Sequence, residues 1–367
     1  MKIAIDKNEL VKALDTVLKA VPVGKVTVQI LEGVLLEADN GKLHLTCNNL
    51  ESAIKYTLDC EVINPGSAVV NSKLFNEIIK KMPDEELDIL TSDKEMSIEA
   101  GKTVMKLLIM KAEYPEMPMS GFEKARFEIE QRIFSEMING VAFAIYDGEE
   151  KPALTGIKID IENNIMNIVA IDGFMMAWKK SLVSAPDASI LLNGKPLENI
   201  SKALDSEGNV QVIMGDNIAL LSADNIQLSV RVIDGSFMNY KRFVPPEYST
   251  SVRIVTRDLS RSLERSVLVL ETGAKGSVDI PLKLTSKADG LKLALGSGKG
   301  SFDEEVSGDI AGKDIEIGLD PRRLITCLRH IGDKEIMLNF TAKEAPVFIT
   351  PVEGDQFIYM VLPVRFK

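Results

Sequence analysis

Two glycine-rich stretches come nearest to a catalytic motif in this 367-residue chain: Gly296–Ser301 reads GSGKGS, and Gly101–Thr103 reads GKT. A phosphate-binding loop follows G-x-x-x-x-G-K-[ST], in which backbone amides and the lysine hold phosphates and the hydroxyl binds Mg²⁺. Gly300 occupies the hydroxyl position of the first stretch, and Met96 occupies the leading glycine position of the second. Because neither motif is complete, we interpret both as hairpin turns.

Other groups with catalytic potential are few and scattered. The acidic runs at 84–86 and 147–150 lie in turn-like stretches without a partnering motif for magnesium. His44 and His330 share no metal-ligand spacing and offer no pairing with a nucleophile. We therefore expect a protein without catalytic residues, metal or cofactor, and not an enzyme.

The three cysteines carry no sign of a disulfide framework or a zinc site. Cys47, Cys60 and Cys327 lie far apart without a CxxC pair, and we predict that all three are buried as small hydrophobes. The N-terminus, MKIAIDKNELVKAL, lacks an apolar run followed by a cleavage site, and no window approaches the ~18 apolar residues of a membrane span. These features predict a cytoplasmic protein that does not enter a membrane.

Helical spacing of apolar residues recurs along the whole chain, which at 367 residues is longer than one core usually grows. Asp6, Asn71, Asn193 and Thr256 suit the N-cap positions of four of these helices. These helices come in three pairs. Within each pair the second helix follows the first by roughly 65 residues, as expected for an internal repeat. The predicted helices cover 7–20, 71–82, 130–145, 194–204, 256–271 and 319–334.

Between the helices the apolar pattern changes to period two, as in 42–46, 96–99 and 209–213, with DG and NG turns. The sequence therefore predicts an α+β fold of three tandem repeats, each with two helices and an antiparallel sheet. Proline-bearing segments separate the repeats, so we expect domains at 1–119, 120–246 and 247–367.

Charge is segregated between these elements. The six predicted helices together carry a formal charge of +5, which leaves −16 for the rest of a chain whose net charge is −11. Taken alone, one such helix is usually a solvated surface. A basic face on an acidic body is instead typical of polyanion binding, here to phosphates without sequence preference because no base-reading motif is present.

The order and spacing of several segments make the whole chain resemble the bacterial DNA polymerase III β subunit, the replicative sliding clamp. The matching segments are MKIAIDKNELVKAL, AEYPEMP, PALTGIKI, VAIDGFMMA, SFMNYKRFVP, IEIGLDPRRLITCL and the ending FIYMVLPVRFK. The resemblance implies a head-to-tail homodimer that closes into a ring, with helices lining a hole for duplex DNA and sheets outside. It also implies partners: a clamp loader, the replicative polymerase and repair proteins.

In that ring the basic helices face the phosphates, and contacts must stay exchangeable because the clamp slides. Lys25 is added from the loop VPVGKVTVQIL, where the resemblance implies a basic residue but the usual prolines are replaced. The DNA-binding candidates are Lys12, Lys25, Lys73, Lys80, Arg132, Lys195, Lys202, Arg257 and Arg261.

The resemblance further implies a groove that takes short hydrophobic peptides of partner proteins. Ile171–Ala177, IDGFMMA, lacks the polar and basic members usual in the family, and Met238 stands where proline is common. Taken alone, IDGFMMA is typical of a strand that leaves a turn into a core, whereas adjacent methionines also suit a peptide-binding surface. The implied groove comprises Lys151, Leu154, Ile171, Gly173, Phe174, Met175, Met176, Met238, Arg242, Phe243, Pro346, Met360, Leu362 and Pro363.

For the dimer interface the resemblance implies contact between Met105 and Leu107 of one subunit and Leu268 and Val269 of the other.

The sequence leaves three hypotheses about function. A processivity clamp predicts a closed dimer retained on circular DNA. A diverged clamp-like module with altered partner specificity predicts the same ring with poor affinity for the usual peptides. A nucleotide-using enzyme predicts binding or turnover of a nucleoside triphosphate. The resemblance favours the first.

Overall fold

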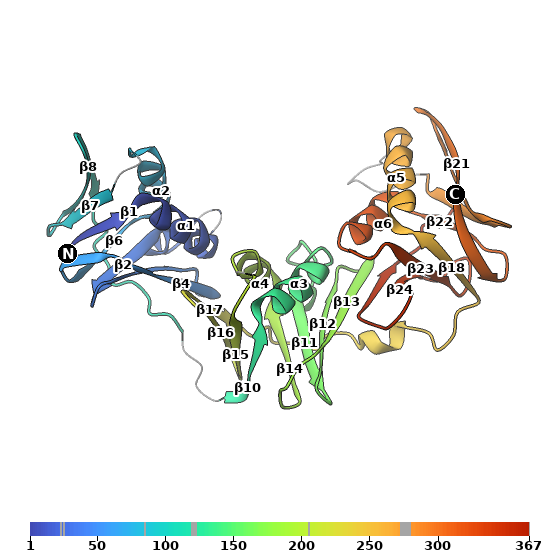
Figure 1. The fold of residues 1–367 in the computed structure, drawn as a ribbon, viewed down its shortest axis with the longest axis horizontal. Helices are drawn as coiled ribbons and strands as arrows, with labels where there is room; N and C mark the ends of the chain where they lie inside the picture. Colours follow the sequence, from blue (N-terminus) through green and yellow to red (C-terminus); the bar gives the residue numbers. More distant parts are fainter. Residues whose placement is uncertain are drawn as a thin grey trace. The chain divides into compact units, whose positions relative to one another are not determined.

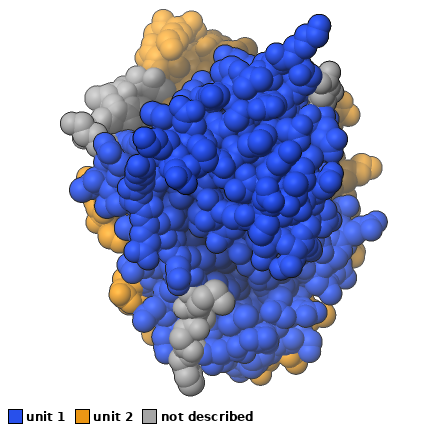
Figure 2. Space-filling view, turned by 90° about the vertical axis from the view of Figure 1, so that its left-hand side faces the viewer, with its two compact units in different colours: residues 1–135, 184–233 blue, residues 136–183, 234–367 orange. Residues whose placement is uncertain are grey.

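The computed structural model describes residues 1–22, 24, 26–83, 86–118, 123–204, 206–271 and 280–366. These residues form two compact units, one of 1–135 with 184–233 and one of 136–183 with 234–367 (Figure 2). Both combine helices with antiparallel sheets, so the predicted α+β class is confirmed. Within the described ranges, no helix is long and apolar enough to cross a membrane.

The first unit contains two antiparallel sheets (Figure 1). One has the strand order β5-β1-β7-β8-β9, with bounds Glu61–Asn64, Lys2–Asp6, Glu86–Thr91, Glu95–Ala100 and Thr103–Leu108. The other has the order β10-β15-β16-β17-β4-β3-β2-β6, with bounds Glu123–Glu130, Asn209–Gly215, Ile218–Ala223, Ile226–Arg231, Ser52–Asp59, Lys42–Asn48, Gly33–Asp39 and Gly66–Asn71. A further strand, β14, covers Ala188–Asn193.

Helices pack against these sheets with their apolar faces. The α-helices are α1 (Lys7–Val17), α2 (Ser72–Lys81) and α4 (Gly194–Ser201), and the 3-10 turns are η1 (Leu18–Ala20) and η2 (Gln29–Glu32). Helix α1 contacts β3, β4 and α2, and it buries Leu10, Leu14 and Val17. The predicted caps Asp6, Asn71 and Asn193 each accept a backbone N–H bond, so these helices begin where the sequence predicts.

In the second unit one sheet runs in the order β11-β12-β13-β25-β24-β23-β18-β21-β20-β19-β22. The bounds, in this order, are Gly156–Glu162, Ile165–Ile171, Met175–Leu182, Phe357–Val361, Val347–Pro351, Glu335–Phe340, Thr250–Val255, Gly300–Gly312, Gly290–Ser297, Leu282–Lys287 and Glu316–Leu319. The paired helices α5 (Thr256–Ser266) and α6 (Pro321–Leu328) contact β21 and β25, respectively. The 3-10 turns are η3 (Pro152–Thr155), η4 (Tyr240–Phe243) and η5 (Val267–Val269).

The remaining helix, α3 (Gln131–Ala142), begins in the first unit and ends in the second. Each of the six predicted helical segments therefore contains a helix. Both glycine-rich stretches are hairpin turns, as predicted, because Ala100 pairs with Thr103 and Ser297 pairs with Gly300. This geometry leaves no phosphate-binding loop at either place.

Two local predictions were wrong. Val255, not Thr256, precedes α5 at the N-cap, and the Thr256 hydroxyl donates to the Asp333 carbonyl at 2.7 Å. A buried hydroxyl needs a partner, and a tertiary carbonyl supplies one here in place of the helix amides. Cys60 is half-exposed, whereas Cys47 and Cys327 are buried as predicted.

Strands from different predicted repeats pair with one another. Leu228 of β17 pairs with Ile54 of β4, and Trp178 of β13 pairs with Ile358 of β25. The predicted central repeat, 120–246, is consequently divided between the two compact units. Edge strands that pair in this way leave fewer unpaired backbone groups, which is how extended sheets avoid aggregation.

Candidate functional site

The candidate DNA-binding cations lie on the helices and are solvent-exposed. Lys12 is on α1, Lys73 and Lys80 on α2, Arg132 on α3, Lys195 and Lys202 at the two ends of α4, and Arg257 and Arg261 on α5. Their apolar helix neighbours face the sheets, so the helical period turns these cations outward. Lys25 lies outside the described residues.

Carboxylates on the same helices hold several of these cations. The ammonium groups of Lys195 and Lys202 both contact Glu198, at 2.8 and 2.6 Å, and Lys80 contacts Asp15 of α1 at 2.6 Å. Burial works to raise the pKa of Glu198, but hydrogen bonds from the two lysines outweigh it, so this pKa lies below its usual range. Surface ion pairs contribute only ~0–1 kcal/mol, so a phosphate can exchange with the carboxylate at little cost.

Lys19 is a cation near these candidates that the sequence did not single out. It lies in η1, and its ammonium group donates to the Asn199 carbonyl of α4 at 3.3 Å. Burial lowers the pKa of Lys19, the charge of Lys202 lowers it further, and Asp15 opposes both. The contact joins positions 180 residues apart. Periodicity along one helix carries no information on such a pair.

The floor of the candidate groove is an apolar cluster in the second unit. It contains the predicted residues Leu154, Ile171, Met176 and Met360, and Leu362 packs against it half-buried. Met175 is also buried. The prediction that IDGFMMA leaves a turn into a core is therefore confirmed for its methionines, which are both buried.

The predicted walls of the groove are more open. Phe174 is 53% exposed and Met238 is 41% exposed, while Lys151, Gly173, Arg242 and Phe243 are also exposed and Pro346 and Pro363 are half-buried. Lys151 Nζ lies 3.8 Å from where a Cβ would stand on Gly173, whose φ of +93° favours glycine. Leu362 and Pro363 border a hollow of about 500 Å³ in the same unit.

The backbone and the ring of Phe174 each have partners at this surface. Asp172 Oδ1 accepts from the backbone N–H groups of Phe174 and Met175 at 2.7 and 2.6 Å, and the Phe174 carbonyl accepts from Leu362 N–H at 2.9 Å. Arg323, which the sequence reasoning did not single out, places its guanidinium 4.0 Å from the centre of the Phe174 ring beside the candidate groove. Burial lowers the pKa of Arg323, against the charges of Asp320 and Asp172. The cation therefore stacks over one face of the Phe174 ring.

The dimer-interface candidates Met105 and Leu107 lie on strand β9, and Leu268 and Val269 lie in the turn η5. Strand β9 is the edge of its sheet, and Met105 is exposed on it, whereas the Leu107 side chain is only 4% exposed and belongs to the core. Its neighbour Leu108, which the sequence reasoning missed, is 74% exposed. In the second unit Leu268 is 79% exposed and Val269 is half-buried. Leu107 thus offers this edge its backbone and not its side chain.

The α+β architecture, with helices packed on antiparallel sheets, is that of sliding clamps of known structure. The DNA polymerase sliding clamp from Bacillus subtilis has a TM-score of 0.93, 25% identity and 100% coverage of both chains. A putative DNA polymerase III beta subunit from Eubacterium rectale has a TM-score of 0.90, 28% identity and 99% coverage of both chains.

Sequence comparison leads to the same class. Models of the DNA polymerase III beta subunit match residues 1–118 for its N-terminal domain, 128–239 for its central domain and 241–365 for its C-terminal domain. The beta sliding clamp of Halalkalibacterium halodurans is 28% identical over the whole of both chains. The chain belongs to the DNA polymerase III beta subunit family.

Proposed function

We propose that the protein is a DNA sliding clamp that encircles duplex DNA as a closed head-to-tail homodimer and tethers the replicative polymerase and repair proteins. The exposed cations on the helices of a chain with net charge −11 carry this proposal. Each subunit supplies three domains, 1–119, 120–246 and 247–367, with two helices each toward the DNA. The protein acts in the cytoplasm without performing chemistry.

Ring closure joins two open sheet edges. Strand β9 exposes Met105 and Leu108, and its outer backbone groups have no neighbouring strand in the described sheet. Among the described strands, the first half of β21, Gly300–Ser307, pairs only with β20, because the pairing with β18 begins at Gly308. Leu268 lies beside this second edge, since α5 and η5 both contact β21. Pairing β9 with this edge covers both rows of backbone groups and the exposed leucines.

The DNA contacts are weak by construction. Each phosphate that a cation neutralises deepens binding and makes it more salt-dependent, so a sliding protein benefits from cations that are already partly neutralised. Glu198 holds Lys195 and Lys202 in this way, and Asp15 holds Lys80. The topology of the ring then supplies retention that the contacts do not.

Replacing Glu198 with glutamine is expected to strengthen DNA binding. The change removes one negative charge and releases two lysines, so the slope of log affinity against log salt should steepen by ~0.9 for each extra phosphate contacted. Fluorescence anisotropy of a labelled duplex over a salt series measures this slope. Asp216→Asn, which frees Lys124 on a sheet strand, is the matched control and should leave the slope unchanged.

The stabilisation that the Glu198 ion pairs give to the fold depends on pH in one direction. Because the pKa of folded Glu198 is lowered, its stabilising contacts are present above the usual glutamate pKa of ~4.3 and are lost as the pH falls through the folded value.

In the salt series described above, equal salt slopes for Glu198→Gln and Asp216→Asn would show that helix α4 does not face DNA.

The candidate groove receives short hydrophobic peptides of the polymerase, the clamp loader and repair proteins. It is formed by the apolar cluster, Phe174, Met238, Phe243 and the basic side chains. A buried apolar floor with half-exposed walls suits an anchor-in-pocket mode of recognition.

Primer extension tests the whole proposed function. With a clamp loader present, the protein should lengthen the products of its polymerase per binding event, and unchanged product lengths would refute the proposal.

A further inference from the structure

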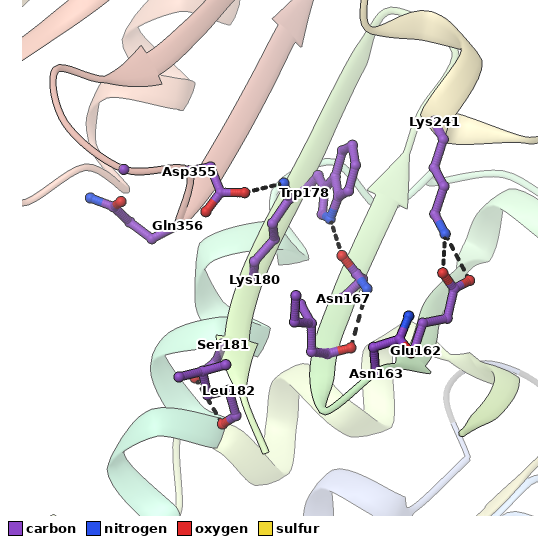
Figure 3. A pocket seen from close by; sticks show the side chains of 12 residues that line it. Glu162, Asn163, Asn167, Trp178, Lys180, Ser181, Leu182, Lys241, Asp355 and Gln356 are labelled. Atoms are coloured by element: carbon purple, nitrogen blue, oxygen red, sulfur yellow. Dashed lines mark hydrogen bonds and ion pairs between the residues drawn. The ribbon is translucent and has the colours of Figure 1, made fainter. Parts of the chain in front are cut away.

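A hollow of about 450 Å³ lies in the second unit, on the sheet face formed by β11, β12 and β13 (Figure 3). Its volume falls within the range of small-ligand sites. Lys241 of η4 borders it on one side, and Asp355 of the turn before β25 borders it on another. None of its lining residues belongs to the predicted peptide groove.

The apolar part of this hollow is exposed and paired. Ile165 and Leu182 stand directly opposite each other at the end of the β12–β13 hairpin, and they are 40% and 80% exposed. Trp178 forms the inner wall, where its Nε1–H donates to Asn167 Oδ1 at 3.0 Å. The indole N–H already has its partner, and the ring, which is only 7% exposed, closes the inner side of the hollow as an apolar wall.

The charges around the hollow are layered. The Lys180 ammonium lies 4.5 Å from the centre of the Trp178 ring and 2.6 Å from Asp355, and its side chain is 19% exposed against 77% for Asp355. Lys241 contacts Glu162 at 2.6 Å, and both side chains of that pair are about half exposed. The Lys180 cation is therefore nearer the interior and its carboxylate partner nearer the solvent. A ligand carboxylate can replace an exposed partner of this kind, because such ion pairs contribute little.

Strand β13 contributes residues to both the groove floor and the hollow. Met176, Trp178 and Lys180 are every second residue of this strand and therefore lie on one face of it. Met176 and Trp178 belong to the same apolar cluster. Four residues of strand span about 13 Å. A peptide whose anchor lies over Met176 therefore reaches Lys180 with about four further residues in extended conformation.

We propose that this hollow is an additional subsite for the segment that flanks the groove-bound motif of a partner protein, and that it selects a carboxylate next to an aliphatic side chain. The aliphatic group packs on Leu182, Ile165 and Trp178, and the carboxylate takes the place of Asp355 at Lys180. This subsite rests on the proposed peptide-binding function of the groove and extends its specificity beyond the apolar anchor.

Tailed peptides test the subsite. The probes are a labelled hexapeptide of serine, leucine and phenylalanine, and the same peptide with a glycine spacer and a Glu-Leu tail at either end. At one of the two ends, the Glu-Leu tail should tighten binding at least about fivefold relative to a Gln-Ser tail. Leu182→Ser and Lys180→Met should each abolish this gain and leave the affinity of the untailed peptide unchanged.

Matched variants elsewhere control for general effects. Leu50→Ser removes an exposed leucine, and Lys124→Met removes an ion-paired lysine, both in the first unit. Both should keep the full gain. A gain at neither end, or one that persists in Leu182→Ser and Lys180→Met, would overturn the subsite.

Trp178 is the single tryptophan of the chain, so its fluorescence reports on the hollow without any groove binding. The Glu-Leu tail alone, at high concentration, should change its emission in the native protein but not in Lys180→Met. If the untailed peptide fails to bind, the groove function fails, and this titration alone decides the subsite. No change in emission in the native protein would then reject it.

Discussion

Replacing Met105 and Leu108 with aspartate is expected to convert the proposed dimer to a monomer. Both side chains are exposed on the open edge of β9, where the proposed partner surface presents Leu268. Two carboxylates buried there without partners would cost several kcal/mol, so the dissociation constant should rise by at least about 100-fold. Sedimentation velocity over a range of protein concentrations measures this change.

The opposite edge of the same sheet provides the control. Ile63 lies on β5, which ends the strand order at the other side, and it is also exposed. Ile63→Asp should remain a dimer, and Leu268→Asp should dissociate like the β9 variant. A dimer that survives both the β9 changes and Leu268→Asp would place the interface elsewhere on the surface.

The second large effect concerns the groove. Phe174→Ala combined with Met238→Ala should weaken the binding of an apolar peptide by about 30-fold, since two half-exposed apolar contacts contribute ~1 kcal/mol each. Their exposure means that the fold should not change. Isothermal calorimetry with the hexapeptide gives the affinity, and sedimentation confirms that the dimer is intact.

Met360 and Leu362 are less suitable positions for this test. Met360 is buried in the apolar cluster, so truncation to alanine would cost ~2–5 kcal/mol of stability as well as any contact with the peptide. Leu50→Ala serves as the control for the loss of an exposed apolar group. Full affinity in the Phe174 and Met238 double variant would remove these residues from the groove.

Local signals in the sequence predicted the helices and hairpins well. Asp6, Asn71 and Asn193 cap helices because the cap bond joins residues two or three positions apart. Thr256 satisfied the same local rule, but its hydroxyl bonds to Asp333, which is close only in the folded chain. Pairing of strands across repeat boundaries was equally out of reach, because both partners look like ordinary strands.

The candidate site divides in the same way. The exposure of Lys12 and Arg257 could be predicted, because it depends only on the helical period of the apolar residues around them. Arg323 was missed because its role arises from stacking on Phe174, about 150 residues away along the chain. The sequence did not reveal that Leu107 is buried and Leu108 is exposed, because a strand alternates its faces and a shift of one residue exchanges core for surface.

Topological linkage to DNA is the central claim, and one measurement tests it directly. The protein is loaded onto nicked circular DNA by a clamp loader, the DNA is then linearised, and the protein that remains bound is quantified before and after. We predict retention on the circles and loss from the linear ends, because a ring held by weak phosphate contacts slides off. Equal retention on circular and linear DNA would mean ordinary electrostatic binding and would contradict the encircling function.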